Sequence, residues 1–167
     1  MNELTLGNPL QYVSTRLVRE PTFSSRPILK SPIEVANFLK QRVDLDMDRE
    51  VFGTICFSPA MQVNHAEITS IGVLDCTLLT MREIYKTAVT SSSGAIVIWH
   101  THPTTGLVKP SHDDYGSTLK AIEAGRILSI KLLDHIILSG DGSWISMNQM
   151  AQEENMDLEE FCKHKWR

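Results

Sequence analysis

Stretches with the two-residue period or the unbroken apolar character of β-strands alternate along the chain with stretches that repeat every three to four residues. The five predicted strands are Glu50–Phe57, Gln62 to about Ile71, Ala95–His102, Leu132–Leu138 and Trp144–Met147. Turn-forming residues, Ser58–Ala60 and Ser139–Gly142, join the first two and the last two of these strands into hairpins. The Ala95 run is apolar until it reaches its histidines, which indicates a strand buried between two layers.

Helix-start signals separate several of these strands. The predicted helices run for about three turns from Ser31, from Thr80 to near Ser91, from Asp114 to about Leu128, and from Asn148 to Phe161. Ser31 and Glu34 have the pattern of a capping box, with Pro32 at the first helical position, and Thr80 and Glu83 repeat it. Strands and helices in this order predict an α/β sandwich with a mixed central sheet flanked by helices.

The end of the Ala95 strand has the pattern of a metal site. His100 and His102 stand at alternate positions, so both imidazoles project from one face of a strand that Pro103 should end. Ser111 reads as the N-cap of the next helix, and Asp114 lies in its first turn. Two imidazoles and one carboxylate are three zinc-type ligands, and a fourth position left for water is typical of a catalytic site.

Each half of this pattern is common by itself. A His-x-His pair is more often on the surface or hydrogen-bonded than metal-bound, and Ser-x-x-Asp is usually only a helix cap. A His-x-His pair at the end of a buried strand, followed by Ser-x-x-Asp, is a much more specific signal of a metal site. The motif contains no cysteine, the residue expected in a closed structural zinc site.

The chain resembles the JAB/MPN-type zinc hydrolases, whose JAMM signature is similar to His100–Pro103 followed by Ser111–Asp114. The surrounding sequence resembles the RadC branch of that family from about Ser31 to Met147. The supporting segments are Asp48–Gly53, Met81–Ile84, Glu123–Leu128 and Leu133–Ile137. Thr101 stands where the family usually has Ser or Asn, and the interval from His102 to Ser111 is one residue longer. The resemblance implies a JAB/MPN-type, cytidine-deaminase-like domain over residues 31–167, without the helix-hairpin-helix segment of longer RadC proteins.

The resemblance also implies roles for individual residues. His100, His102 and Asp114 would hold Zn²⁺, Glu50 would act as general base, and the Ser111 hydroxyl would steady the oxyanion. The implied substrate class is a peptide or isopeptide bond in a protein or peptide. Spacing alone does not select Glu50 over two other carboxylates. Of these, Glu67 is expected on an exposed strand face and Glu83 in the second capping box. Asp134 and His135 lie in an apolar strand, where a structural or supporting role is favoured over ligation.

Composition limits the other readings. The chain has 167 residues, of which 42% are hydrophobic and 22% charged, which fits one globular domain. A net charge of −4 argues against a general nucleic-acid surface. Residues 1–30 contain Pro9, Pro21 and Pro27 without a sustained period, and we expect an extended arm that could pair with a sheet edge or form a homo-oligomer.

The same composition predicts a cytoplasmic protein that does not interact with a membrane. The chain shows neither a signal peptide nor a stretch long enough to cross a membrane. Its cysteines, Cys56, Cys76 and Cys162, are odd in number and irregularly spaced, which suits a reducing compartment, and Cys56 is expected in a core strand.

Three alternative functions compete with the hydrolase. A zinc deaminase would need a Cys-x-x-Cys pair, which the sequence lacks. A JAB-type module that binds a partner without catalysis is less consistent with three retained ligand types. A DNA-repair accessory role follows from the historical association of RadC-like proteins, and the acidic charge argues against it.

Overall fold

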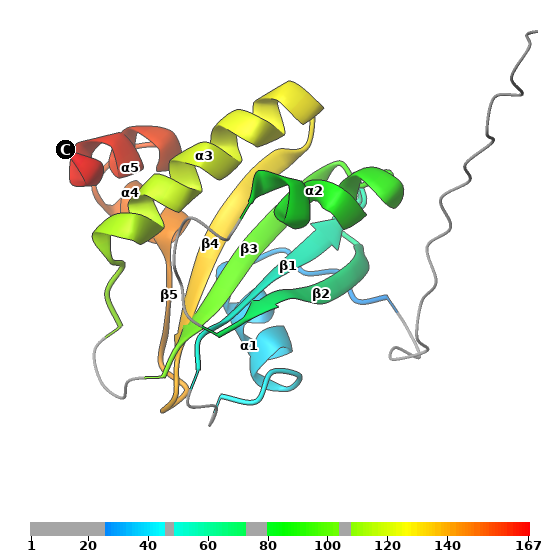
Figure 1. Cartoon of the computed structure of the whole chain (residues 1–167), viewed down its shortest axis with the longest axis horizontal. Coiled ribbons are helices and arrows are strands. Elements are labelled where there is room, and N and C mark those ends of the chain that lie inside the picture. Colours follow the sequence, from blue (N-terminus) through cyan, green and yellow to red (C-terminus); the bar gives the residue numbers. More distant parts are fainter. Residues whose placement is uncertain (1–25, 46–48, 73–79, 104–107) are drawn as a thin grey trace, which may run out of the picture.

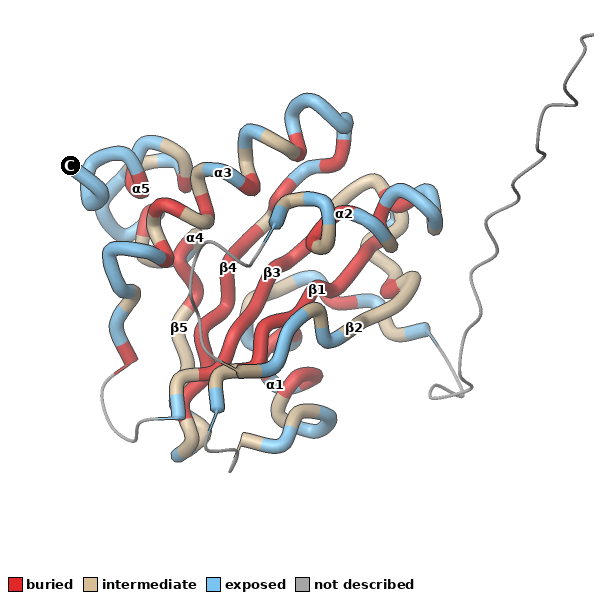
Figure 2. Tube along the Cα trace, in the orientation of Figure 1, coloured by how far each residue is buried: buried red, intermediate tan, exposed pale blue. Residues whose placement is uncertain are grey.

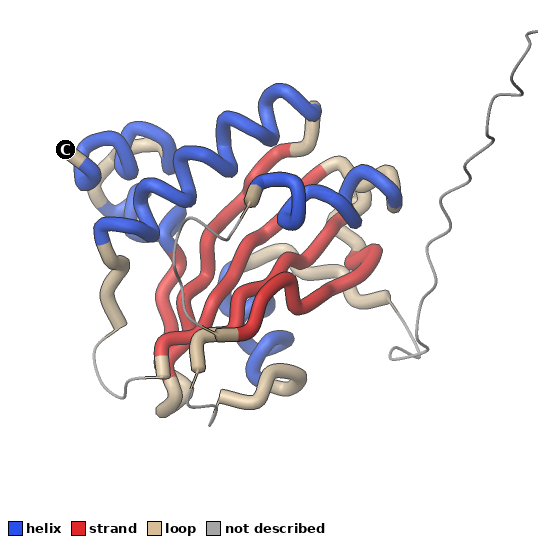
Figure 3. The backbone as a smooth tube through the Cα atoms, viewed as in Figure 1, coloured by secondary structure: helices blue, strands red, loops and turns tan. Residues whose placement is uncertain are grey.

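A mixed sheet lies at the centre of the protein, and helices cover both of its faces (Figure 1, Figure 3). The computed structural model describes residues 26–45, 49–72, 80–103 and 108–167. The described elements are α1 (Pro32–Lys40), β1 (Val51–Phe57), β2 (Val63–Ile71), α2 (Met81–Thr90), β3 (Ala95–His102), α3 (His112–Leu128), β4 (Lys131–Ser139), β5 (Trp144–Ser146), α4 (Met147–Glu153) and α5 (Leu158–Trp166).

The strand order is β2-β1-β3-β4-β5, which makes β3 the central strand. Strand β3 is antiparallel to β1 and parallel to β4, while the β1–β2 and β4–β5 pairs are antiparallel. Because a parallel connection needs a crossover, α3 crosses one face of the sheet between β3 and β4 (Figure 1). The predicted α/β sandwich with a mixed central sheet is confirmed.

Two apolar cores lie on the two faces of this sheet. Helix α1 packs on one face through Val35, Phe38 and Leu39, and α2 to α5 lie on the other (Figure 1). All seven residues of β1 are buried, and β3 is buried from Ile96 to Thr101, as Figure 2 shows in red. The continuous burial of β3 follows from its central position, as its apolar run predicts.

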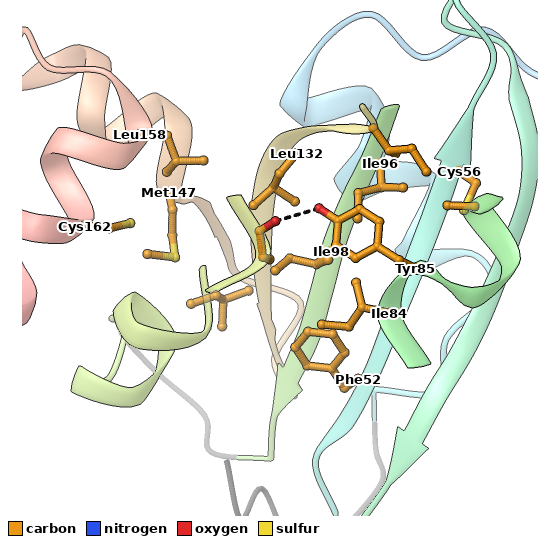
Figure 4. Packing of buried hydrophobic residues seen from close by; sticks show 14 of the residues in the cluster. Phe52, Cys56, Ile84, Tyr85, Ile96, Ile98, Leu132, Met147, Leu158 and Cys162 are labelled. Carbon is orange, nitrogen blue, oxygen red and sulfur yellow. Dashed lines mark hydrogen bonds between the residues drawn. The ribbon is translucent and has the colours of Figure 1, made fainter. Parts of the chain in front are cut away.

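The larger core lies under α2 and α3 (Figure 4). Ile84, Tyr85 and Ala88 are the buried residues of α2. A buried tyrosine hydroxyl needs a hydrogen-bond partner, and Tyr85 Oη donates to the backbone oxygen of Ala121 in α3 at 2.7 Å (Figure 4). Cys56 is fully buried on the same side of the sheet, as predicted, while Cys76 lies outside the described residues.

The two predicted capping boxes differ in outcome. Ser31 and Glu34 form the reciprocal bonds of a capping box at the start of α1, which confirms that prediction. The prediction for Thr80 and Glu83 is wrong, because the Thr80 side chain makes no capping hydrogen bond. The Glu83 carboxylate instead pairs with Lys86, one turn further along α2, at 2.6 Å.

The C-terminal region is helical but is divided differently from the prediction. Met147, assigned to a strand, is the first residue of α4, and Ser146 caps that helix through its hydroxyl. The predicted single helix over residues 148–161 is two helices, α4 and α5. Asn155, between them, has a φ of 57°. This left-handed conformation does not continue an α-helix, so the chain turns there.

The end of the predicted N-terminal arm is attached to the sheet. Ile28 forms an antiparallel bridge with Gln62, just before β2, and the backbone N–H of Leu29 donates to Met61 at 3.2 Å. Residues 1–25, which make up most of that arm, lie outside the described residues. In the described parts of the chain, no helix has the length and apolar character to cross a membrane.

Candidate metal centre

Strand β3 ends in two histidines that point to one face of the sheet. His100 and His102 occupy alternate positions, and Thr101 between them faces the opposite side. His100 is fully buried, whereas the His102 side chain is 19% exposed. The pair therefore leads from the core at His100 toward solvent at His102.

Ser111 begins α3 and fixes the position of Asp114. The Ser111 hydroxyl accepts from the backbone N–H of Asp114 at 3.2 Å, and Asp114 Oδ2 accepts from the Ser111 N–H at 2.6 Å. The predicted N-cap is confirmed, and the bonds are reciprocal. The Ser111 hydroxyl also donates to the same Oδ2 at 2.7 Å. One carboxylate oxygen is thus held by Ser111.

The side chains of His100, His102 and Asp114 converge at one point. His100 Nε2 lies 3.2 Å from Asp114 Oδ1 and 2.8 Å from His102 Nε2. His102 Nε2 lies 3.8 Å from Asp114 Oδ2. One ligand atom from each of these three side chains lies within 4.8 Å of the other two. Among the described residues, no other group of three or more His, Cys, Asp or Glu side chains meets this criterion.

These separations fit a small divalent cation. Ligands about 2.0 to 2.2 Å from a tetrahedral Zn²⁺ stand roughly 3.3 Å from one another. The three observed distances, 2.8, 3.2 and 3.8 Å, lie on both sides of that value. The two imidazole nitrogens and the Asp114 carboxylate are therefore close enough together to hold one metal ion.

The charge states of the buried groups suit this role. Burial lowers the pKa of His100 strongly, and the imidazole of His135 lowers it further. A neutral imidazole is the form that binds a metal. Burial alone would raise the pKa of Asp114, but His100, His135 and the Ser111 hydrogen bonds outweigh it, so the pKa is lowered. The centre thus combines a neutral ring with an ionised carboxylate at neutral pH.

A buried hydrogen-bond chain lies behind His100. His100 Nδ1 is 2.8 Å from His135 Nε2, and His135 Nδ1 is 2.8 Å from Thr118 Oγ1. Thr118 Oγ1 donates to the backbone oxygen of Asp114 at 2.6 Å. Phe52 from β1 stacks on the His100 ring with the planes 6° apart. His135 is thus a satisfied buried group, as expected. Thr118 was missed, although it stands one turn after Asp114.

Asp134, the neighbour of His135, has a separate role. Its carboxylate accepts from Ser146 Oγ at 2.5 Å, from the Asn148 N–H at 2.9 Å and from the His135 N–H at 2.7 Å. Burial raises its pKa to about 6, although these hydrogen bonds act in the opposite direction. The carboxylate joins β4 to the start of α4, which agrees with the structural role expected for it.

Glu50 lies next to the centre, directly before β1. Phe52 pairs with His100 across the β1–β3 ladder, and Glu50, two residues earlier, falls on the same face. Burial raises the pKa of Glu50, His102 lowers it and Asp114 raises it. Both of these neighbours belong to the centre, so the Glu50 carboxylate is within its electrostatic reach. Its raised pKa is the direction that a general acid or base needs.

The competing carboxylates lie elsewhere. Glu67 was expected on an exposed strand face, and this is wrong, because its side chain is half-buried and accepts a hydrogen bond from Thr87 of α2. Burial raises the pKa of Glu67 above its usual value. Glu83 is paired with Lys86 on α2. The longer interval before Ser111 includes residues 104–107, which lie outside the described residues.

Comparison with known proteins identifies relatives over most of the chain. A family model for the RadC-like JAB domain matches residues 29–154. A UPF0758 protein of Rubrobacter xylanophilus is 36% identical over 124 residues, which cover 74% of this chain and 53% of the relative. A second, of Moorella thermoacetica, is 36% identical over 125 residues, or 75% of this chain and 53% of the relative.

A third UPF0758 protein, of Methanosarcina barkeri, is 34% identical over 131 residues, which cover 77% of this chain and 56% of the relative. The chain spans about half the length of the curated relatives it matches. The family model covers more than half of the chain and includes both histidines, Ser111 and Asp114. The chain therefore belongs to the RadC-like JAB domain family.

Proposed function

We propose that this chain is a zinc-dependent hydrolase of the JAMM type that cleaves a peptide or isopeptide bond. The observation that carries the proposal is the convergence of His100, His102 and Asp114 within 4.8 Å of one another. A bound zinc ion with an open position would lower the pKa of its water to about 7 and so supply a nucleophile at neutral pH.

Glu50 is the proposed proton carrier. It directly precedes β1, the strand that pairs antiparallel with β3, and its pKa is raised by burial and by Asp114 against the opposing effect of His102. A carboxylate whose pKa lies closer to neutrality can take a proton from water and pass it to a leaving nitrogen. The position of Glu50 on the His100 face gives it access to the proposed reaction centre.

Ser111 is the proposed support for the oxyanion. Its hydroxyl accepts from the Asp114 N–H and donates to Asp114 Oδ2, so its single proton is already used by the carboxylate. To stabilise an oxyanion, that proton would turn from Asp114 to the substrate oxygen. The Ser111 N–H would still hold Oδ2, at 2.6 Å. The carboxylate could therefore keep its place while the hydroxyl acts.

The proposed substrate is a protein or peptide, and the proposed compartment is the cytoplasm. The substrate class follows from the family, since a JAB-type centre acts on an amide carbonyl. The net charge of −4 argues against a nucleic-acid substrate. Assembly through the N-terminal arm stays a prediction, because residues 1–25 lie outside the described residues.

Metal content and hydrolysis of a peptide library, measured side by side, test this proposal. We expect about one zinc per chain, and loss of hydrolysis on chelation with recovery when zinc is restored. Glu50→Gln should keep its zinc while turnover falls by about 10²- to 10⁴-fold. Glu67→Gln is the matched control, since Glu67 is also a half-buried glutamate of raised pKa and should leave turnover unchanged.

Several outcomes would contradict the proposal. If the protein is prepared without chelator and contains iron instead of zinc, the proposed metal is wrong. Two histidines and a carboxylate also suit Fe²⁺. A chain that binds no metal would favour the JAB module that binds a partner without catalysis. Loss of zinc in Glu50→Gln would mean that Glu50 is a ligand. Full activity in that variant would remove it from proton transfer.

A further inference from the structure

We propose that His135 and Thr118 are positioning residues that fix the tautomer of His100 and thereby set the metal affinity of the centre. This inference rests on the metal site of the proposed function, but not on hydrolysis. His100, His135 and Thr118 are fully buried, and Asp114 is 5% exposed. The hydrogen bonds among them are therefore shielded from water, which could otherwise exchange partners with them.

The Thr118 hydroxyl decides which atoms donate and which accept in the hydrogen bonds that run through His135 to His100. Its Oγ1 lies 2.6 Å from the backbone oxygen of Asp114, and two oxygens at this distance need a proton between them. A backbone carbonyl carries no proton, so the Thr118 hydroxyl supplies it. Met147 Sδ, at 3.5 Å from the same hydroxyl, is a weaker acceptor. A hydroxyl has one proton, so Thr118 can only accept from His135.

The remaining protons follow in order. His135 Nδ1, 2.8 Å from Thr118 Oγ1, must carry an N–H. A neutral imidazole has one N–H, so His135 Nε2 is bare and accepts from His100 Nδ1 at 2.8 Å. His100 Nε2 is then bare as well: it accepts from His102 Nε2 at 2.8 Å and lies 3.2 Å from Asp114 Oδ1. The chain thus turns the electron pair of His100 toward the point where the three ligand atoms meet.

Loss of the Thr118 hydroxyl removes this direction. His135 could then carry its proton on Nε2 and donate to His100 Nδ1. In that reversed pair, His100 has its N–H on Nε2, facing Asp114, and must lose it before a metal can bind. Because the hydroxyl also holds the Asp114 backbone, Thr118 supports two of the three proposed ligands.

Nitrogen-15 NMR of the metal-free protein reads the tautomers directly. We expect both His100 and His135 to carry their N–H on Nδ1 in the native chain. Thr118→Val, which has the same shape without a hydroxyl, should shift the pair toward protonated Nε2. Thr118→Ser keeps the hydroxyl and should retain the native tautomers. A native His100 with its N–H on Nε2 would overturn the inference.

The affinity for Co²⁺, measured by its absorption during titration against a chelator, is the second readout. We expect Thr118→Val to bind Co²⁺ about tenfold more weakly than the native chain and His135→Phe about 10- to 100-fold more weakly. Thr118→Ser should stay within about threefold of the native chain. If His135→Phe does not fold, Thr118→Val and Thr118→Ser decide the question by themselves.

The two proposals fail in different ways. If the native chain binds no metal, the proposed function fails, and the NMR experiment still decides the tautomers. If the native protein binds Co²⁺ and folded Thr118→Val binds it equally well, the metal site stands. The role proposed for the hydrogen bonds from Thr118 through His135 to His100 is then wrong. A merely structural Thr118 would lower stability in Thr118→Val but would leave both the tautomers and the affinity unchanged.

Discussion

The backbone N–H of Val51 donates to Thr101 Oγ1 at 2.9 Å. This bond ties the first residue of β1 to the residue that separates the two histidines of β3. Both residues are buried, with exposed fractions of 0% and 4%. Glu50 precedes Val51 directly, so the bond also holds the backbone that carries the proposed proton carrier.

Replacement of Thr101 by valine should therefore destabilise the strand next to the centre. The change leaves a buried N–H of Val51 without its partner, which costs about 1–3 kcal/mol of unfolding free energy. Denaturation by urea measures this loss. Thr101→Ser should recover most of it, because the hydroxyl remains. Thr101 points away from the histidines, so neither variant should lose metal, and a metal-free Thr101→Val would contradict this geometry.

Ser111→Ala should weaken both α3 and the proposed metal site. Loss of the N-cap costs about 0.5–2 kcal/mol of unfolding free energy. The Asp114 carboxylate also loses the hydroxyl that holds Oδ2 at 2.7 Å, and we expect Co²⁺ affinity to fall by about tenfold. Denaturation and metal titration measure the two effects separately.

Ser31→Ala is the matched control for this experiment. Ser31 forms the same kind of capping box at the start of α1, on the opposite face of the sheet. Its loss should lower stability by a similar amount and leave Co²⁺ affinity unchanged. Equal affinity in the native chain and Ser111→Ala would show that Ser111 acts only as a cap.

Gly53 of β1 allows the Trp99 ring to lie across the strand. A Cβ at this position would overlap the Trp99 ring and the backbone oxygen of Glu67. Gly53→Ala should therefore lower the unfolding free energy by at least the ~1–3 kcal/mol typical of overpacking. Gly94→Ala is the control, because its Cβ would meet Pro59 at an ordinary 3.5 Å. Similar stabilities of the two variants would be inconsistent with this packing.

The proximity of the three proposed ligands could be predicted because each step depends on local patterns. Strand alternation puts His100 and His102 on one face, and the capping pattern puts Asp114 in the first helical turn. The support behind them could not be predicted in detail. His135 and Thr118 meet only because β4 lies beside β3 with α3 packed above it, and sequence spacing does not encode that contact.

The prediction that Glu67 is exposed was wrong for a similar reason. On an edge strand, alternation tells which residues share a face but not which helix covers that face. Helix α2 brings Thr87 to the Glu67 carboxylate and shields it from water. The Thr80 side chain makes no capping bond, and the carboxylate of its expected partner, Glu83, pairs with Lys86. In both cases the carboxylate contacts a side chain that the predicted pattern did not include.

The covered position of Glu67 predicts a specific dependence of stability on pH. Burial raises its pKa in the folded state, with the Thr87 hydrogen bond opposing. Above the ordinary glutamate pKa of about 4.3, the folded chain then binds more protons at this site than the unfolded chain. The unfolding free energy contributed by Glu67 therefore falls as pH rises through that window. Glu67→Gln lacks this titration, so we expect it to gain stability relative to the native chain as pH rises.

Glu83→Gln tests the sign of this argument on the neighbouring helix. Hydrogen bonding to Lys86 lowers the pKa of Glu83 in the folded state, so its contribution to stability is present at higher pH and is lost as pH falls. Relative to the native chain, Glu83→Gln should therefore lose stability as pH rises, by a small amount because the pair is exposed. Urea denaturation at pH values of about 4, 5 and 7 measures both differences. Slopes of the same sign for the two variants would contradict the burial of Glu67, since burial is the largest cause of a pKa shift opposite in direction to that of Glu83.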